Sequence, residues 1–317
     1  MANATVSSLG QANEAGVLDA LFLKVFSGEV LSSFNARTVM SDKTRVRNIA
    51  SGKSAQFPAM GRIGASYHTP GAEIVGVAIE HGEKVVTIDD LLISHSFIAN
   101  IDEAKNHYEV RSEYSTQMGA ALAQTFDRNL LSLAVKTARA AEAGAVADQG
   151  AAVSTNLGTL TPTIQNIIDG IYAAASDMDD LFLPAEDRFV IVSPTTYWGM
   201  VQNDKVINRD FGGTGSYVDG TVPKIAGMSI VKSSNLAVNH TTSTDYPDTA
   251  GTKYGVSALD TSALIFQRGA LGTVKLLELA SENQYDIRRQ GTLMVSKMAV
   301  GHGAINPQGI HELRAAV

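Results

Sequence analysis

Residue types that bind phosphate occur together in one short run, Ser51-Gly52-Lys53-Ser54. The run resembles the end of a phosphate-binding loop, in which backbone N–H groups wrap the phosphates and the lysine reaches them. That loop also needs a glycine five residues before Gly52, and Arg47 occupies the position. The surrounding segment reads as extended chain, not as the junction of a buried strand and a helix. A nucleotide-binding enzyme built on Gly52-Lys53-Ser54 therefore stays only as a remote alternative.

Other candidate chemistry is weaker. The run Gly212-Gly213-Thr214-Gly215 lacks the third glycine of a dinucleotide site. His302 lies between two glycines, but the sequence has no nucleophile motif to pair with it. The seven histidines show no metal-ligand spacing, and the aspartates around 177–180 are more typical of a solvated helix end. We therefore predict no enzyme, no cofactor and no metal site.

Basic residues form the more informative pattern. The segment 37–62 carries one acidic residue, Asp42, against six basic ones. Further along, Arg288-Arg289 stand beside Asp286, a pattern typical of an interface ion pair, with a phosphate contact as the alternative. The residues that we expect to contact another subunit are Arg45, Arg47, Lys53, Arg62, Arg288 and Arg289.

The composition limits the class of protein. Only 18% of the 317 residues are charged, which indicates that much of the surface is covered by other subunits. The net charge of −7 argues against tight binding of nucleic acid over a broad face. Cysteine is absent, so there are no disulfides. We find neither a secretory signal nor an apolar run long enough to span a membrane, and expect a soluble protein made in a cytoplasm.

One long helix organises the elements that would position these residues. Apolar or small residues recur at spacings of three and four between residues 100 and 144, without proline. Asn100 with Glu103 forms a capping-box pattern, and Gly144 suits the left-handed position after the helix. A coiled-coil segment, or two helices with a break near Gly119, remains an alternative.

Before this helix, the chain reads as three reaching elements. Residues 1–16 are small and polar and indicate a flexible arm. Residues 17–34 form a short amphipathic helix, which must dock on the body or on another subunit. Segments 45–69 and 83–97 read as the two arms of a long β-hairpin, which needs a partner surface because a two-stranded hairpin is marginal alone.

After the helix, residues 146–262 read as one α/β unit with long loops at 203–222 and 234–253. A proline-capped helix starts at Thr161-Pro162, a buried strand covers 188–193 and a second strand covers 224–233. Short strands then follow between 263 and 302. If these pack on the long helix, they form a discontinuous domain with it, and the α/β unit is inserted between them.

Long runs of the sequence resemble one known family, the major capsid proteins of short-tailed bacteriophages of the T7 type (autographiviruses). Together the runs span most of 21–125 and 269–307, which is far more than a short motif. They include LFLKVFSGEVLSSFNART, SGKSAQFPAMGR, EKVVTIDDLL, IDEAKNHYEVRSEYSTQMGAALA and GTVKLLELASENQYDIRRQGTLMVSKMAVGHGAINP. Residues 146–262 resemble the family less.

This resemblance implies an α+β fold, the tailed-phage capsid fold of the HK97 type. Its parts map onto the elements above: an N-terminal arm (1–40), an extended β-hairpin called the E-loop (41–97), the spine helix of the P-domain (98–145), a central α/β A-domain (146–262), and P-domain strands with the C-terminal tail (263–317). Some capsids of this fold join subunits by an isopeptide bond. Lys53 and Lys84 lie in the hairpin region, but nothing in the sequence identifies such a pair.

The resemblance implies a structural function. Copies of the chain would form hexamers and pentamers of an icosahedral shell around double-stranded DNA, without sequence-specific binding and without a membrane. A scaffolding protein and a portal protein would be partners, and the shell would be assembled in the bacterial cytoplasm as part of the virion. An encapsulin-like compartment with the same fold is the alternative from another class.

Overall fold

In the computed structural model the described residues are 20–71, 73–99, 111–146, 149–159, 161–203, 222, 224–236 and 253–316. They divide into two compact units. Unit 1 takes in the described parts of Met1–Thr38, Asp90–Phe126 and Leu277–Val300, and unit 2 those of Val39–Asp89, Asp127–Leu276 and Gly301–Val317. The predicted arm at 1–16 and the predicted helix start at Asn100 lie outside the described residues, as do most of the two predicted loops, 203–222 and 234–253.

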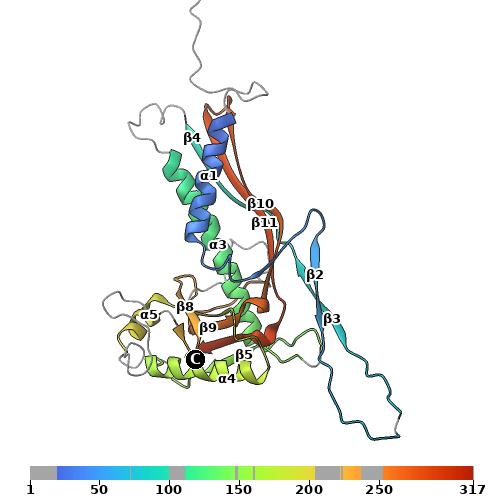
Figure 1. Ribbon diagram of the computed structural model, residues 1–317. Coiled ribbons are helices and arrows are strands. Elements are labelled where there is room, and N and C mark those ends of the chain that lie inside the picture. The colour runs from blue at the N-terminus through green and yellow to red at the C-terminus, as the bar shows by residue number, and fades with distance from the viewer. Residues whose placement is uncertain are drawn as a thin grey trace, which may run out of the picture. The chain divides into compact units, whose positions relative to one another are not determined.

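The fold is a mixed α+β fold, as expected (Figure 1). Its α-helices are α1 (Ala20–Arg37), α3 (Arg111–Arg139), α4 (Ile164–Asp180) and α5 (Pro194–Val201), and short 3-10 turns cover Arg268–Ala270 and Pro307–Gly309. Its strands are β1 (Arg45–Asn48), β2 (Ser54–Met60), β3 (His81–Thr87), β4 (Leu92–Ala99), β5 (Val153–Asn156), β6 (Arg188–Val192), β7 (Lys224–Ile225), β8 (Met228–Lys232), β9 (Thr261–Gln267), β10 (Leu271–Asp286), β11 (Gly291–Ala304) and β12 (Ile310–Arg314).

Unit 1 packs two helices on one face of a sheet. Val30 of α1, Met118 of α3 and Met294 of β11 form its buried cluster, with Ile98 and Leu279 against it. The long helix therefore packs on the C-terminal strands, and the short N-terminal helix docks on its own subunit. Helix α3 runs through Gly119 without a break. The glycine lets α1 approach closely, because a Cβ there would lie 2.6 Å from the carbonyl oxygen of Val30.

The end of α3 differs from the prediction. The last helical residue is Arg139, and the left-handed residue is Ala141 (φ 46°), not Gly144. The N–H of Glu142 donates to the carbonyl of Thr137, and that of Ala141 to the carbonyl of Ala138, which together make a Schellman cap. Hydrogen bonding thus holds alanine in a conformation that usually favours glycine.

The predicted hairpin is shorter than expected. Strands β2 and β3 pair antiparallel from Ser54↔Thr87 to Met60↔His81 and form a two-stranded sheet of their own. The ends of the two predicted arms that lie away from the hairpin tip, β1 and β4, belong to a four-stranded sheet of order β1-β10-β11-β4. There β1 pairs in parallel with Gly272–Lys275, and β4 pairs antiparallel with β11. Alternation along the segments predicted the strands, but it does not identify their partners.

The base of this hairpin is packed inside unit 2. Ala55, Phe57 and Val86 form a buried cluster with Val274 and Ile305, so the hairpin does have a surface within its own subunit. Beyond the base, the described residues from 61 to 80 form a loop without helix or strand (Figure 1). Those from 62 onward are exposed.

Unit 2 is built on a six-stranded sheet of order β5-β12-β9-β6-β8-β7. Helix α4 covers it, with Ile167, Ile171 and Met178 packed against β6, β9 and β12 (Figure 1). The sheet includes β9 and β12, which pair in it with strands of the predicted α/β unit. Only pairing across the fold distinguishes them, because a strand pattern does not identify its partner.

Three local expectations can be compared with unit 2. Helix α4 is capped by Thr163, whose hydroxyl accepts from the N–H of Asn166, so the predicted cap at Thr161 was two residues early. Helix α5 follows Ser193 as N-cap with Pro194 at the first position, as expected. The strand predicted at 224–233 is two strands, because residues 226 and 227 both take positive φ and form a tight turn between β7 and β8.

Candidate functional site

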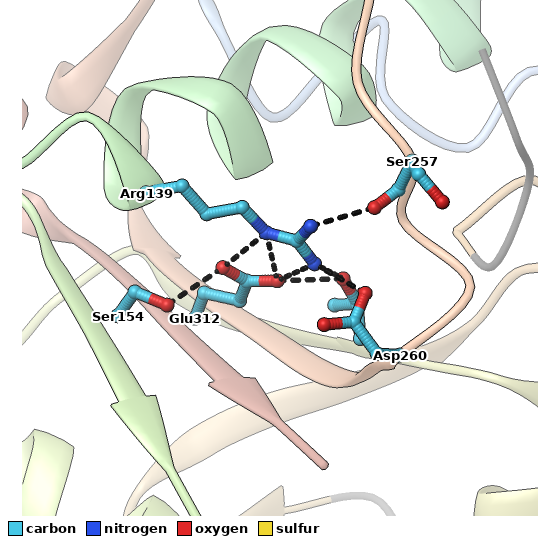
Figure 2. Close-up of polar contacts among 6 residues, drawn as sticks. Arg139, Ser154, Ser257, Asp260 and Glu312 are labelled. Atoms are coloured by element: carbon cyan, nitrogen blue, oxygen red, sulfur yellow. Dashed lines mark hydrogen bonds and ion pairs between the residues drawn. The ribbon is translucent and has the colours of Figure 1, made fainter. Parts of the chain in front are cut away.

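The densest polar cluster surrounds Arg139, the last residue of α3 (Figure 2). Its Nε donates to both carboxylate oxygens of Glu312 at 3.0 Å, and Nη2 donates to one of them at 2.7 Å. Nη1 donates to the carbonyl of Ser257 at 2.6 Å, and Nη2 also reaches Asp260 at 2.6 Å. Ser154 of β5 donates to Glu312 at 2.8 Å. The cluster thus ties the helix end to β5, β12 and the segment before β9.

The electrostatics of this cluster indicate a structural role. Burial alone lowers the pKa of Arg139, but the hydrogen bonds that it donates to Glu312 and Asp260, together with their negative charges, outweigh burial and raise the pKa above its ordinary value. Glu312 is fully buried, and its oxygens also accept from the hydroxyls of Ser154 and Thr261. A carboxylate whose oxygens are all engaged is poorly placed to act as a general base. The arrangement holds a fixed charge network inside the subunit.

A second cluster surrounds His302, also in unit 2. Its Nδ1 lies 3.1 Å from the hydroxyl of Thr273, and its backbone N–H donates to the hydroxyl of Tyr254 at 3.4 Å. Tyr254 and Lys253 in turn both donate to the carboxylate of Asp89. Burial lowers the pKa of His302 to about 3, and the charge of Lys253 adds to the effect. The ring is therefore neutral at pH 7 and packs as part of the core.

Among the described residues, the candidates of the sequence form no catalytic constellation, and the run at 212–215 lies outside that part of the chain. The run at 51–54 leads into strand β2, whereas a phosphate-binding loop leads into a helix. Asp179 pairs with Arg188 at 2.7 Å. Across the described ranges, no group of three or more His, Asp or Glu side chains could hold a metal ion. Within those same ranges, no helix is long and apolar enough to cross a membrane.

The basic residues of the hairpin region have partners in their own chain. The guanidinium groups of Arg45 and Arg47 lie 5.8 and 5.9 Å from the ring centre of Phe57, and Arg47 donates to the carbonyl of Gln56 at 2.5 Å. Arg62 donates to the carbonyl of Leu181. All three side chains remain exposed, as does that of Lys53.

Arg288 and Arg289 lie in the turn between β10 and β11, in unit 1. Nε of Arg289 is 3.7 Å from the carboxylate of Asp286, and that carboxylate accepts the backbone N–H of Arg288 at 2.8 Å. Both arginine side chains are exposed. The structure therefore separates the six predicted residues into one group in unit 2 and one pair in unit 1.

Two features were missed from the sequence. Arg139 is not among the predicted site residues, and no local signal marks Glu312 as its partner 173 positions away. The segment 73–80 lies between the two predicted arms and was assigned to neither, although Ile74, Val75, Val77 and Ile79 follow one another closely there. That β-branched run was a readable signal.

Comparison with known proteins gives a consistent result. The family described as Gp10A-like major capsid protein matches residues 56–314. The major capsid protein of Enterobacteria phage T3 is 32% identical over 94% of this chain and 92% of its own length. That of Escherichia phage T7 is 32% identical over 93% of this chain and 91% of its own length.

A solved structure extends this similarity to three dimensions. The capsid of cyanophage P-SCSP1u contains a chain that is 43% identical to this one and superposes with a TM-score of 0.78. The match covers 99% of both chains, including the hairpin and both units.

Proposed function

Since the chain belongs to the Gp10A-like family of major capsid proteins, we propose that its copies form the icosahedral shell around the double-stranded DNA of a short-tailed phage. The chain is a structural protein of a phage shell, and its fold is the tailed-phage capsid fold of the HK97 type. The observation that carries the proposal is similarity to a phage capsid chain over almost the full length of both. The relatives favour this shell over an encapsulin-like compartment.

The parts of the chain then take the following roles. Residues 1–40 serve as the N-terminal arm, 41–97 as the E-loop, and 98–145 as the spine helix of the P-domain. Residues 146–262 form the A-domain, now joined by β9 and β12, and the remaining strands of 263–317 complete the P-domain. The packed base of β2–β3 and the exposed loop beyond it support the E-loop assignment.

Hexamers and pentamers of the chain would form the shell, with a scaffolding protein and a portal protein as partners in the bacterial cytoplasm. A chain of net charge −7 suits a wall that encloses DNA without gripping it. We further propose that the exposed basic residues Arg45, Arg47, Lys53 and Arg62 lie against an acidic neighbour, and that Arg288 and Arg289 contact another subunit.

Co-expression with the scaffolding protein of the same phage tests this function. We expect closed icosahedral particles by electron microscopy and fast sedimentation, and particles from infected cells should contain double-stranded DNA. Purified particles that contain a bacterial enzyme in place of DNA would support the compartment instead. A chain that stays monomeric with a working scaffolding protein would contradict both.

A further inference from the structure

Helix α4 is followed by a residue whose backbone conformation its side chain does not favour. Phe182 comes directly after the C-cap Leu181 and has a left-handed φ of 55°. Its N–H donates to the carbonyl of Asp179 at 2.9 Å, and the N–H of Leu183 donates to that of Met178 at 3.0 Å. These bonds form a Schellman cap, in which glycine is preferred at the position of Phe182. The ring is 83% exposed, which indicates that it serves something other than the helix end itself.

The end of α4 also lacks positive charge of its own. Its last turn contains no basic residue but three acidic ones, Asp177, Asp179 and Asp180. The carbonyl groups at a helix C-terminus carry partial negative charge, so carboxylates there are unfavourable and cations are favourable. Arg188 meets one of the aspartates, at 2.7 Å from Asp179. Another cation that reaches this helix end comes from the hairpin.

Arg62 links the hairpin to the end of α4, and both lie in unit 2. It donates to the carbonyl of Leu181, and its guanidinium carbon lies 5.4 Å from the centre of the Phe182 ring. A guanidinium group at this distance is attracted to the face of an aromatic ring. The ring and the carbonyl together thus form a small receptor for the guanidinium group of Arg62.

The hairpin is also seated where the pairing of β2 with β3 ends. A Cβ on Gly61 would lie 3.2 Å from the side chain of Val146, and one on Gly82 would lie 2.3 Å from the carbonyl oxygen of Ala145. The two glycines therefore let both sides of the hairpin approach residues 145 and 146 closely. Arg62 follows directly after this contact.

Past Arg62 the loop has less support. A Cβ added at Gly64, Gly71 or Gly76 would meet no described atom within 4 Å, and Tyr67 is fully exposed. Arg62 therefore lies at the point where the loop leaves the body of unit 2. Ordering a loop during association costs conformational entropy, and fixing its direction in advance lowers that cost.

We propose that Arg62 and Phe182 are positioning residues, which fix the direction in which the loop beyond residue 62 leaves its own subunit. The contact is made within one chain, before any other copy is present. Phe182 keeps its unfavourable backbone conformation because its ring binds Arg62. The effect of this contact on assembly rests on the shell function proposed above. Substitutions of Phe182 test it without changing any charge, so the test is separate from a charge contact of Arg62 with a neighbour.

Spin labels test the positioning in free subunits, because the chain has no cysteine of its own. One label is attached at Tyr67→Cys in the loop, and the other at Ala173→Cys, which is exposed on α4. Pulsed EPR should give a narrow distance distribution for the otherwise wild-type chain and a broad one for Phe182→Gly. Phe182→Tyr keeps an aromatic ring and should restore the narrow distribution. A distribution for Phe182→Gly as narrow as that of the wild type would overturn the inference, as would a broad one in the wild type.

Thermal unfolding separates positioning from stability. Phe182→Gly places the preferred residue at the left-handed position, so the subunit should unfold at or above the wild-type temperature. A clear fall in the unfolding temperature would show that the ring stabilises the subunit itself, and would overturn the positioning role.

Assembly with scaffolding protein measures the consequence. Phe182→Gly should lower the initial rate of shell formation by about threefold or more. Arg62→Ala should do the same, and the double variant should be no slower than either, since the two residues form one contact. Tyr172→Ala, which removes another exposed ring from α4, should assemble at the wild-type rate.

The outcomes distinguish the inference from the shell function. Wild-type rates from both single variants would overturn the role in assembly, and losses that add in the double variant would overturn the pairing of Arg62 with Phe182. If the wild-type chain forms no shells, the shell function itself fails, whereas the EPR result on free subunits still decides whether the contact positions the loop.

Discussion

Arginine side chains in unit 2 have two kinds of surroundings. Arg139 is held by two carboxylates, one of them fully buried, and by a carbonyl. Arg45 and Arg47 stand over the face of Phe57 and stay exposed. The Arg139 network closes its charges inside the subunit, whereas Arg45 and Arg47 leave positive charge on the surface. We propose that the first arrangement serves the fold and the second serves assembly.

The difference lies in desolvation. A buried charge costs free energy unless geometry and hydrogen bonds compensate for it, so removing one partner is expensive. An exposed charge is screened, and its pair contributes at most about 1 kcal/mol. Substitutions in the interior should therefore change the stability of the subunit, and substitutions in the basic hairpin should change assembly.

The largest effect is expected from a buried charge with no partner at all. Leu122 of α3 is 2% exposed, and Leu122→Asp should cost about 4 kcal/mol or more, because nothing like the Arg139 network surrounds it. The variant should misfold, as measured by thermal unfolding and solubility. The control is Ala121→Asp, one residue along the same helix and exposed, which should fold normally. A soluble Leu122→Asp subunit with native stability would show that this face of α3 is not packed.

Breaking the Arg139 network should come next. Glu312→Gln keeps the shape of the side chain but removes the charge, so it should cost about 3–5 kcal/mol in chemical denaturation. The double variant Glu312→Gln with Arg139→Met should lose less than the sum of the two single variants, since either change alone already breaks the pair. If the double variant loses as much as the sum of the single variants, the two residues do not act as a pair.

His302 sharpens the comparison, because it is a buried base that stays neutral. Its pKa of about 3 in the folded chain lies below the ordinary value of 6.5. Stability is therefore full above about pH 6.5 and is lost as the pH falls toward 3, with about 2 kcal/mol lost by pH 5. Burial lowers the pKa of His311 too, in the same direction.

The measurement is the melting temperature of wild type and His302→Gln between pH 8 and pH 4. The variant should show a smaller loss on acidification, which separates His302 from the carboxylates that titrate in both proteins. Parallel curves would mean that His302 does not remain neutral in the folded chain.

The smallest effect on stability is expected in the hairpin region. Reversing both charges, with Arg45→Glu and Arg47→Glu, should cost the subunit under about 1 kcal/mol per residue. Shell yield after co-expression with scaffolding protein should fall, and higher salt should weaken wild-type assembly in the same direction. Lys224→Glu, an exposed reversal in β7, serves as the control. An unfolded double variant would show that these arginines stabilise the subunit itself. A normal shell yield would show that their charges do not hold subunits together.

Much of the architecture could be read from the sequence, because local signals determine it. The apolar spacing of α3, the Ser193-Pro194 start of α5 and the β-branched run of β6 each predict an element within a few residues. The family could be read as well, since long runs of residues match it. Its structural function, and the two-part α+β fold, followed from that resemblance.

What the tertiary structure alone decided is which elements meet. The sequence by itself predicted extended arms over 45–69 and 83–97, but only long-range pairing put β1 and β4 in a sheet with β10 and β11 instead of in the hairpin. Likewise, β9 pairs with β6 over more than seventy positions, and β12 pairs with β9 over more than forty. Arg139 and Glu312 meet for the same reason. A strand pattern records which face is buried, and a charge records its sign, but neither records the partner, because partners are chosen by the folded chain as a whole.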